Sequence, residues 1–270
     1  MAVFLLDRLA RAGRFLWSVW AGLTGLALVA AAWQAGHELY GDFILSAPAA
    51  TLLRAAELLA DAEAQALVVE TVRRATQGFL LAAAAGAAAG LAAGYSPATM
   101  RAMRPIVTVL LGVPPIAWIV LAMIWFGSSD GTVLTTILVA ATPMTFVGVA
   151  EGVMARDRKL DDMATAFGAG PLLRLWTLGL RHVSAYLFPV LTVSLGTAFK
   201  VAVMAELLAN TGGIGGALAL ARSNLDVTTA LAWVLIAVAG LVAVEYLLVH
   251  PVRAEFERWR DAARPWGVKR

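Results

Sequence analysis

The chain has 270 residues, of which 60% are hydrophobic and only 14% are charged. Soluble domains carry about 25% charged residues, so this composition indicates an integral membrane protein with no sizeable soluble domain. Apolar runs of the length that a hydrocarbon core of ~30 Å requires recur along the chain. The formal net charge of +3 is small, and the absence of Cys excludes disulfides, thiolate metal sites and Cys nucleophiles.

The first apolar run, at about 15–33, follows a basic start that contains Arg8, Arg11 and Arg14. A basic start, an apolar run and an Ala-rich end also describe a cleaved signal peptide. The run exceeds the ~7–15 apolar residues of a signal-peptide core. We therefore expect residues 1–34 to be a retained first span with the N-terminus inside.

Residues 35–76 are the most polar stretch and are expected on the outer side as a periplasmic or interfacial segment. Within it, residues 50–72 alternate apolar and charged positions at helical spacing. This pattern predicts an amphipathic helix along the outer face of the membrane. A solvated connector fits the same pattern.

The core is expected to hold five further spans within residues 77–250. The first of these, at about 78–95, contains Gly86, Gly90 and Gly94. Glycines at every fourth residue form one stripe, along which another helix backbone can approach closely. The alternative is that the stripe only reflects an Ala- and Gly-rich composition.

The next span, at about 106–126, carries Pro114 and Pro115 near its middle. Proline removes a backbone hydrogen bond and clashes one turn back, so we expect a kink or a break there. In a membrane, irregular backbone is tolerated where it is buried in protein or lines a cavity. Pro114, Pro115 and Trp118 are therefore candidates for a translocation pathway, although a purely structural kink is equally compatible.

The remaining spans are expected at about 132–150, 185–209 and 228–249, with a Gly-rich outer loop at 210–226 and a basic cytoplasmic tail at 251–270. The span at 185–209 holds Lys200 and Glu206. Ionisable side chains within a membrane normally face protein or water, and six residues put these two about 240° apart around the helix. We expect Lys200 to face the pathway and attract an anion, with Glu206 near its outer mouth. Structural pairing at a dimer interface is the alternative.

The distribution of positive charge supports this membrane topology. Sixteen of the 21 Lys and Arg residues fall in the four segments expected on the cytoplasmic side. The positive-inside rule then predicts six spans with both termini cytoplasmic.

Residues 160–180 interrupt the apolar pattern with two short helical segments. Asp161 and Asp162 lie in the first turn of the earlier one, where carboxylates favour a helix N-terminus. Gly168 is placed to end that helix, and Pro171 suits the first position of the next. A surface helix-turn-helix without any partner would show the same signals.

This segment resembles the EAA loop of ABC importer permeases. Asp162 stands at the Glu position of that motif, Met163 and Ala164 at the two Ala positions, and Gly168 at the Gly. The motif is imperfect, because Asp replaces Glu, Met replaces one Ala, and Arg181 stands where the family has Pro. The resemblance implies a cytoplasmic coupling helix that docks in a groove of a separate ATPase subunit. The candidate coupling residues are Asp161, Asp162, Met163, Ala164, Phe167, Gly168 and Leu178.

Residues 76–249 more widely resemble the nitrate/sulfonate/taurine branch of these permeases. The resemblance is carried by Gly112-Val113-Pro114-Pro115, by Trp125-Phe126-Gly127 and by Ala205-Glu206-Leu207. It implies an all-α membrane protein of the type I importer class, with six transmembrane helices, in the bacterial inner membrane. It also implies a second permease copy, which the family's use of one gene favours as a homodimer. Two ATPase subunits that bind ATP and Mg and a periplasmic solute-binding protein complete the expected partners, and no nucleic acid is expected.

The sequence lacks the features of an enzyme. None of its three lysines follows a Gly, so no phosphate-binding loop is present, and no catalytic or metal-ligand constellation stands out. We therefore expect no catalytic residue, metal or cofactor in this chain. An ion-coupled secondary transporter and a structural subunit of a larger complex are the two competing hypotheses. The resemblance suggests a small anion as substrate, and the sequence does not identify which one.

Overall fold

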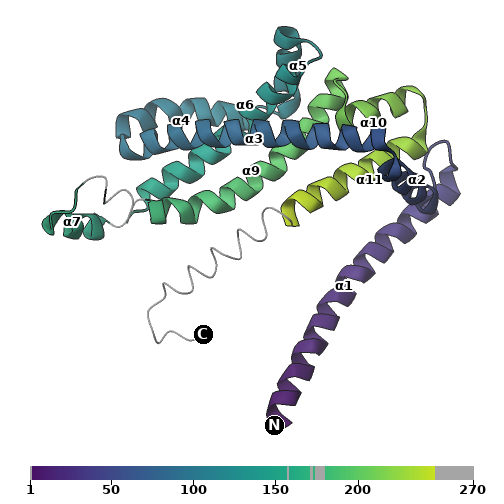
Figure 1. Ribbon diagram of the computed structural model, residues 1–270, viewed down its shortest axis with the longest axis horizontal. Coiled ribbons are helices and arrows are strands. Elements are labelled where there is room, and N and C mark those ends of the chain that lie inside the picture. The colour runs from purple at the N-terminus through teal and green to yellow at the C-terminus, as the bar shows by residue number, and fades with distance from the viewer. Residues whose placement is uncertain (1, 157, 171–172, 174–179, 247–270) are drawn as a thin grey trace.

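The computed structural model describes residues 2–156, 158–170, 173 and 180–246 (Figure 1). Regular structure in these ranges is helical throughout, which confirms an all-α protein. The helices in chain order are α1 (Ala2–Tyr40), α2 (Pro48–Ala60), α3 (Ala62–Tyr95), α4 (Pro97–Gly112), α5 (Pro115–Phe126), α6 (Asp130–Met154), α7 (Arg158–Ala166), α9 (Leu180–Ala209), α10 (Gly213–Ser223) and α11 (Val227–Val244).

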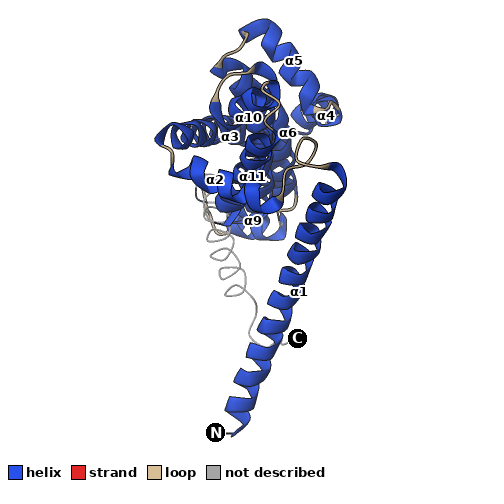
Figure 2. Cartoon of the chain, turned by 90° about the vertical axis from the view of Figure 1, so that its right-hand side faces the viewer, coloured by secondary structure: helices blue, strands red, loops and turns tan. Residues whose placement is uncertain are grey.

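Four helices in the described ranges are long and apolar enough to cross a membrane: α3, α6, the Tyr186–Ala209 part of α9, and α11. The pair α4 and α5 adds a fifth crossing if its two halves form one bent span. These helices occupy the places predicted for the five core spans. The first predicted span lies within α1, which extends away from the bundle (Figure 2). A total of six spans, and the retention of α1, stay predictions.

The outer segment differs from its prediction. One helix was expected over residues 50–72, whereas α2 ends at Ala60 and α3 starts at Ala62 and continues through the predicted second span. Asp61 causes the change, because its backbone is extended and its carboxylate accepts a hydrogen bond from the Ala64 N–H at 3.1 Å. Asp61 thus caps α3. Since α3 has 34 residues, it is about 51 Å long at ~1.5 Å per residue and exceeds the membrane core.

The glycine stripe of α3 packs against α6, as predicted. A Cβ on Gly86 would lie 2.6 Å from the Thr142 carbonyl oxygen, and one on Gly90 would lie 2.7 Å from the Phe146 carbonyl oxygen. Gly94 makes an equally close approach one turn further on. Only glycine permits this spacing, so the stripe sets the distance between the two helices. Helix α9 packs against both α3 and α6 and completes the centre of the bundle.

The break at Pro114 and Pro115 is confirmed. Helix α4 ends at Gly112, Val113 and Pro114 are extended, and α5 begins at Pro115. A proline favours extended backbone in the residue before it, so the consecutive prolines hold two residues out of the helix. The axes of α4 and α5 differ by 96°, and α5 packs against α6 and α9.

The outer loop predicted for residues 210–226 instead contains helix α10. Glycine is a poor helix former, which is why the run at 212–216 suggested a loop. In the structure Gly213, Ile214 and Gly215 are buried at the start of α10. A Cβ on Gly215 would lie 2.6 Å from the Glu206 Cβ. The glycines therefore allow α10 to pack tightly on α9, and this packing outweighs their low helix propensity.

Candidate functional site

The first part of the predicted coupling segment forms α7, a helix of nine residues. It starts at Arg158, earlier than predicted, so Asp161 and Asp162 follow its first three residues and do not begin the helix. Its end lies at Gly168, which has φ +75°. The amides of Gly168 and Ala169 donate to the carbonyl oxygens of Thr165 and Ala164 at 3.0 and 2.9 Å. These two bonds form a Schellman motif, which confirms the predicted helix end. Leu178 and Pro171 lie outside the described residues.

Helix α7 presents apolar side chains to its surroundings. Met163 on α7 is 51% exposed, and Phe167, the residue after its last, is 84% exposed. The Phe167 N–H donates to the Met163 carbonyl oxygen at 3.1 Å, so the two side chains lie on the same side. Asp162 is exposed, Ala164 is half-buried, and Asp161 belongs to the same helix. In Figure 1 α7 lies beyond the end of the bundle. Met163 and Phe167 are thus accessible to another molecule, and their role in coupling stays a prediction.

The pathway candidates lie at two places in the bundle. Pro114 is exposed and Pro115 half-buried at the break, and Trp118 follows on the first turn of α5. The Trp118 indole nitrogen is buried and has no hydrogen-bond partner among the described residues. On α9, Lys200 is exposed between the buried residues Phe199 and Val201. The Lys200 side chain therefore points away from the packed core of the helix bundle.

Glu206 lies in a different environment from Lys200. It is fully buried, and its carboxylate accepts hydrogen bonds from Arg74 Nη1 at 3.0 Å and Thr71 Oγ1 at 2.7 Å. The structure therefore does not bring Lys200 and Glu206 together. It pairs Glu206 with α3 of the same chain, and a role at the mouth of the pathway stays a prediction.

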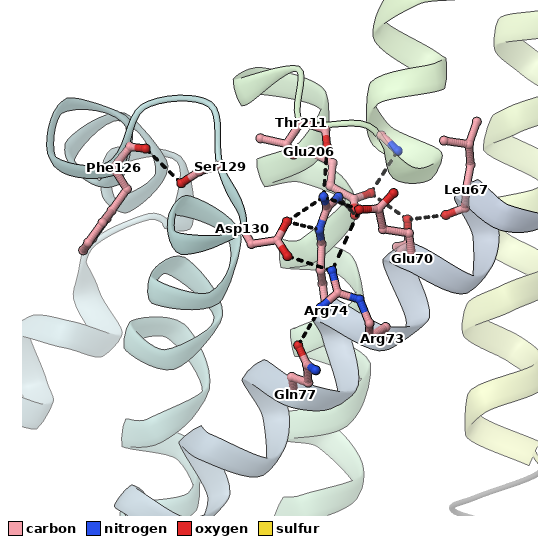
Figure 3. Close-up of polar contacts among 12 residues, drawn as sticks. Leu67, Glu70, Arg73, Arg74, Gln77, Phe126, Ser129, Asp130, Glu206 and Thr211 are labelled. Atoms are coloured by element: carbon pink, nitrogen blue, oxygen red, sulfur yellow. Dashed lines mark hydrogen bonds and ion pairs between the residues drawn. The ribbon is translucent and has the colours of Figure 1, made fainter.

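Arg74, which the sequence analysis did not single out, is the centre of this cluster (Figure 3). Its side chain is 4% exposed and contacts three carboxylates. Arg74 Nε donates to Asp130 Oδ1 at 2.8 Å, and Nη2 donates to Glu70 Oε1 at 2.6 Å. Nη2 also donates to the Thr211 carbonyl oxygen at 2.9 Å. One guanidinium thus links α3 to α6, to α9 and to the turn before α10.

Arg73 extends the cluster toward the surface. Its Nη2 donates to Asp130 Oδ2 at 2.7 Å, and both side chains are 43% exposed. Asp130 is the first residue of α6, where a carboxylate favours the helix N-terminus. A sequence signal did exist for this cluster. Arg73 and Arg74 are an adjacent basic pair in the segment expected on the outer side, where positive charge is disfavoured.

The comparisons with known proteins decide the family. Residues 82–254 match the family described as "Binding-protein-dependent transport system inner membrane component". The chain belongs to this family. It is therefore the membrane component of an ABC importer, as the resemblance implied, and the relatives that it matches are permease subunits.

Individual relatives agree with this assignment. The permease is 26% identical over 252 residues to a Bacillus subtilis permease named for aliphatic sulfonates transport, SsuC, with 89% of this chain and 88% of that protein covered. It is 30% identical over 169 residues to the taurine transport permease TauC of Escherichia coli, covering 63% of this chain and 60% of that protein. It is 29% identical over 148 residues to the nitrate import permease NrtB of Leptolyngbya laminosa, covering 55% of this chain and 52% of that protein. The permease thus aligns with about half the length of this nitrate permease.

A solved structure supports the same fold. The permease aligns with a chain of the MetNI methionine ABC transporter in an inward facing conformation, with a TM-score of 0.57 and 18% identity. The alignment covers 72% of the permease and 98% of that chain. The bundle is therefore an ABC importer permease fold. Glu70, Thr71 and Arg74 precede the family match at residue 82, whereas Asp130 and Glu206 lie within it.

Proposed function

We propose that two copies of this permease form the pathway of an importer for a small oxyanion such as a sulfonate, taurine or nitrate. Two ATPase subunits, which bind ATP and Mg, drive it, and a periplasmic solute-binding protein delivers the anion. The permease itself supplies no catalytic group. It crosses the inner membrane six times, with both termini and α7 in the cytoplasm.

The observation that carries the coupling part of this proposal is the surface of α7. Phe167 and Met163 are exposed on a helix that projects from the bundle. Apolar side chains of this size are the usual anchors of a protein interface. Family membership favours an ATPase as the partner over a transporter that works alone or a purely structural subunit.

The substrate class rests on Lys200. An ammonium group is a donor without any acceptor capacity, and an exposed one on a spanning helix needs water, protein or an anion nearby. The named relatives act on taurine, nitrate and aliphatic sulfonates, which share charged oxygen atoms as acceptors. Lys200 of both copies would attract such an oxyanion into the pathway.

Two experiments test the two parts. Scrambling residues 160–168 should abolish co-purification of the ATPase while the permease still inserts and folds. Retention of the ATPase would contradict the coupling role of α7.

For the substrate, uptake of taurine, nitrate and an alkanesulfonate is measured in proteoliposomes that contain the whole importer. Lys200→Met should reduce uptake of the transported anion about tenfold, the equivalent of ~1.4 kcal/mol. Lys200→Arg, which keeps the charge, should retain most of it. Wild-type uptake by Lys200→Met would refute the role of this residue, and transport of none of the three anions would refute the substrate class.

A further inference from the structure

The N-terminus of α10 is capped by residues of other helices. The residue before it is Gly212, which has no side chain to serve as a cap. The Gly215 N–H donates instead to Glu206 Oε2 at 3.1 Å, and the Ile214 N–H donates to Thr71 Oγ1 at 2.8 Å. The first amides of a helix need acceptors. Here α9 and α3 provide them, so the position of α10 depends on both helices.

The same carboxylate also holds the buried arginine. Glu206 Oε1 accepts from Arg74 Nη1, while Glu206 Oε2 accepts from Thr71 and Gly215. Arg74 in turn donates to the carbonyl oxygen of Thr211, in the turn between α9 and α10. Arg74 therefore holds the turn before α10, and Glu206 holds its first turn; Figure 3 shows both side chains beside Thr211.

Stability alone does not explain why an ion pair is buried between these helices, because apolar side chains could hold them together equally well. Replacing a buried ion pair by apolar side chains is often neutral or stabilising. What a guanidinium adds is direction, because its five N–H donors form a rigid planar fork. Asp130 contacts Nε and Nη2, the Thr211 carbonyl oxygen contacts Nη2, and Glu206 contacts Nη1. Arg74 and its acceptors thus specify one arrangement of the four helices α3, α6, α9 and α10.

We propose that Arg74 and Glu206 are positioning residues that hold α10 on α3 and α9, so that the outer ends of α3, α6, α9 and α10 move as one body during transport. This inference rests on the proposed function, because it concerns the conformational cycle of that importer. Movement at the outer end then takes place between this body and its neighbours, and not within it.

The test compares the distance between α3 and α10 in two states. Because the chain has no Cys, spin labels can be attached to two introduced cysteines, at the exposed positions Val69 on α3 and Leu220 on α10. Pulsed electron resonance then measures their distance in the whole importer, nucleotide-free and trapped with ATP and vanadate. Labelled chains are diluted with unlabelled chains so that only one copy is observed.

The wild-type distance should be a single peak that shifts by less than about 2 Å between the states, which is the size of a helix shift. Glu206→Gln, which removes the charge that pairs with Arg74, should broaden this peak and lower transport. Asp130→Asn is the matched control. It weakens the same arginine cluster but does not contact α10, so it should leave the peak narrow.

A larger shift in the wild type, or a narrow peak in Glu206→Gln, would overturn the proposal. Because the wild-type comparison needs neither variant, a larger shift there would refute the proposal even if Glu206→Gln does not assemble. If no ATPase co-purifies, the proposed function fails separately. The comparison of Glu206→Gln with Asp130→Asn in the nucleotide-free permease then still tests the positioning role.

Discussion

The two ends of the bundle, which we propose are the outer and the inner end in the membrane, differ in where their side chains find partners. At the outer end, Arg74 contacts Glu70, Asp130 and Glu206, all within the same chain. At the inner end, α7 exposes Phe167 and Met163. The end with the arginine cluster is therefore held together by contacts within the chain, whereas α7 leaves apolar side chains exposed. In the importer that we propose, energy would enter at α7, and the rigid body would lie at the opposite end.

The largest effect is expected from removing Arg74, the centre of the arginine cluster. Arg74→Ala leaves Glu206 buried without its cation, so unfolding should become easier by about 3–5 kcal/mol. The melting temperature of the detergent-solubilised permease measures this loss. Glu57→Gln is the control, since it removes an exposed pair with Arg54 at 3.1 Å and should change little. Equal shifts for both variants would contradict a special role of the cluster.

A substitution at α7 should weaken binding of the ATPase and leave the stability of the permease unchanged. Phe167→Asp places a charge in the proposed interface and should weaken ATPase binding by at least ~2 kcal/mol, about 30-fold, as for an interface hot spot. The affinity between the purified subunits measures this change, with the melting temperature of the permease unaltered. Leu225→Asp, at an exposed outer position, should not affect ATPase binding. A lower melting temperature of Phe167→Asp would show that Phe167 packs within the permease, which would contradict its role in an interface.

Between the two ends, the contact of α3 with α6 should tolerate no added atom. Gly90→Ala puts a Cβ 2.7 Å from the Phe146 carbonyl oxygen, so we expect a destabilisation of about 1–3 kcal/mol from overpacking. Thermal melting compares it with Gly25→Ala in α1, where nothing lies within 4 Å of the added Cβ. Gly25→Ala should be neutral or slightly stabilising. A neutral Gly90→Ala would mean that the two helices can separate freely.

The smallest expected effect concerns the cap of α11 at the outer surface. The Thr229 N–H donates to Asp226 Oδ1 at 2.9 Å, and this bond lowers the pKa of the Asp226 carboxyl. Because the pKa is lower in the folded state, the stabilisation is present above the ordinary pKa and is lost as the pH falls.

Asp226→Ala should therefore cost about 1 kcal/mol at neutral pH, measured by thermal melting. The difference from wild type should shrink below a pH of about 4. Asp226→Asn retains a capping oxygen and should show no such pH dependence. A difference between Asp226→Ala and wild type that stays constant through this pH range would contradict the account of the cap.

The sequence predicted features that depend on neighbouring residues or on a regular period. The break at Pro114 and Pro115 follows from proline geometry, and the helix end at Gly168 follows from a local capping pattern. The glycine stripe beginning at Gly86 could be predicted because its four-residue period matches the helix.

Features that depend on distant residues were not predicted. Arg74 and Glu206 are 132 positions apart in the sequence, so no local pattern reveals their contact. Helix α10 was missed because the glycines that permit its packing are the same residues that suggested a loop. The continuity of α3 was missed because its polar first third resembles a separate surface helix.

The most direct test of the central claim is a cryo-EM map of the complex isolated from its native membrane. We expect an ATPase subunit to contact Met163 and Phe167 of each permease copy, while Arg74 and Glu206 remain paired within the chain. A map that shows only lipid or solvent around α7 would contradict it.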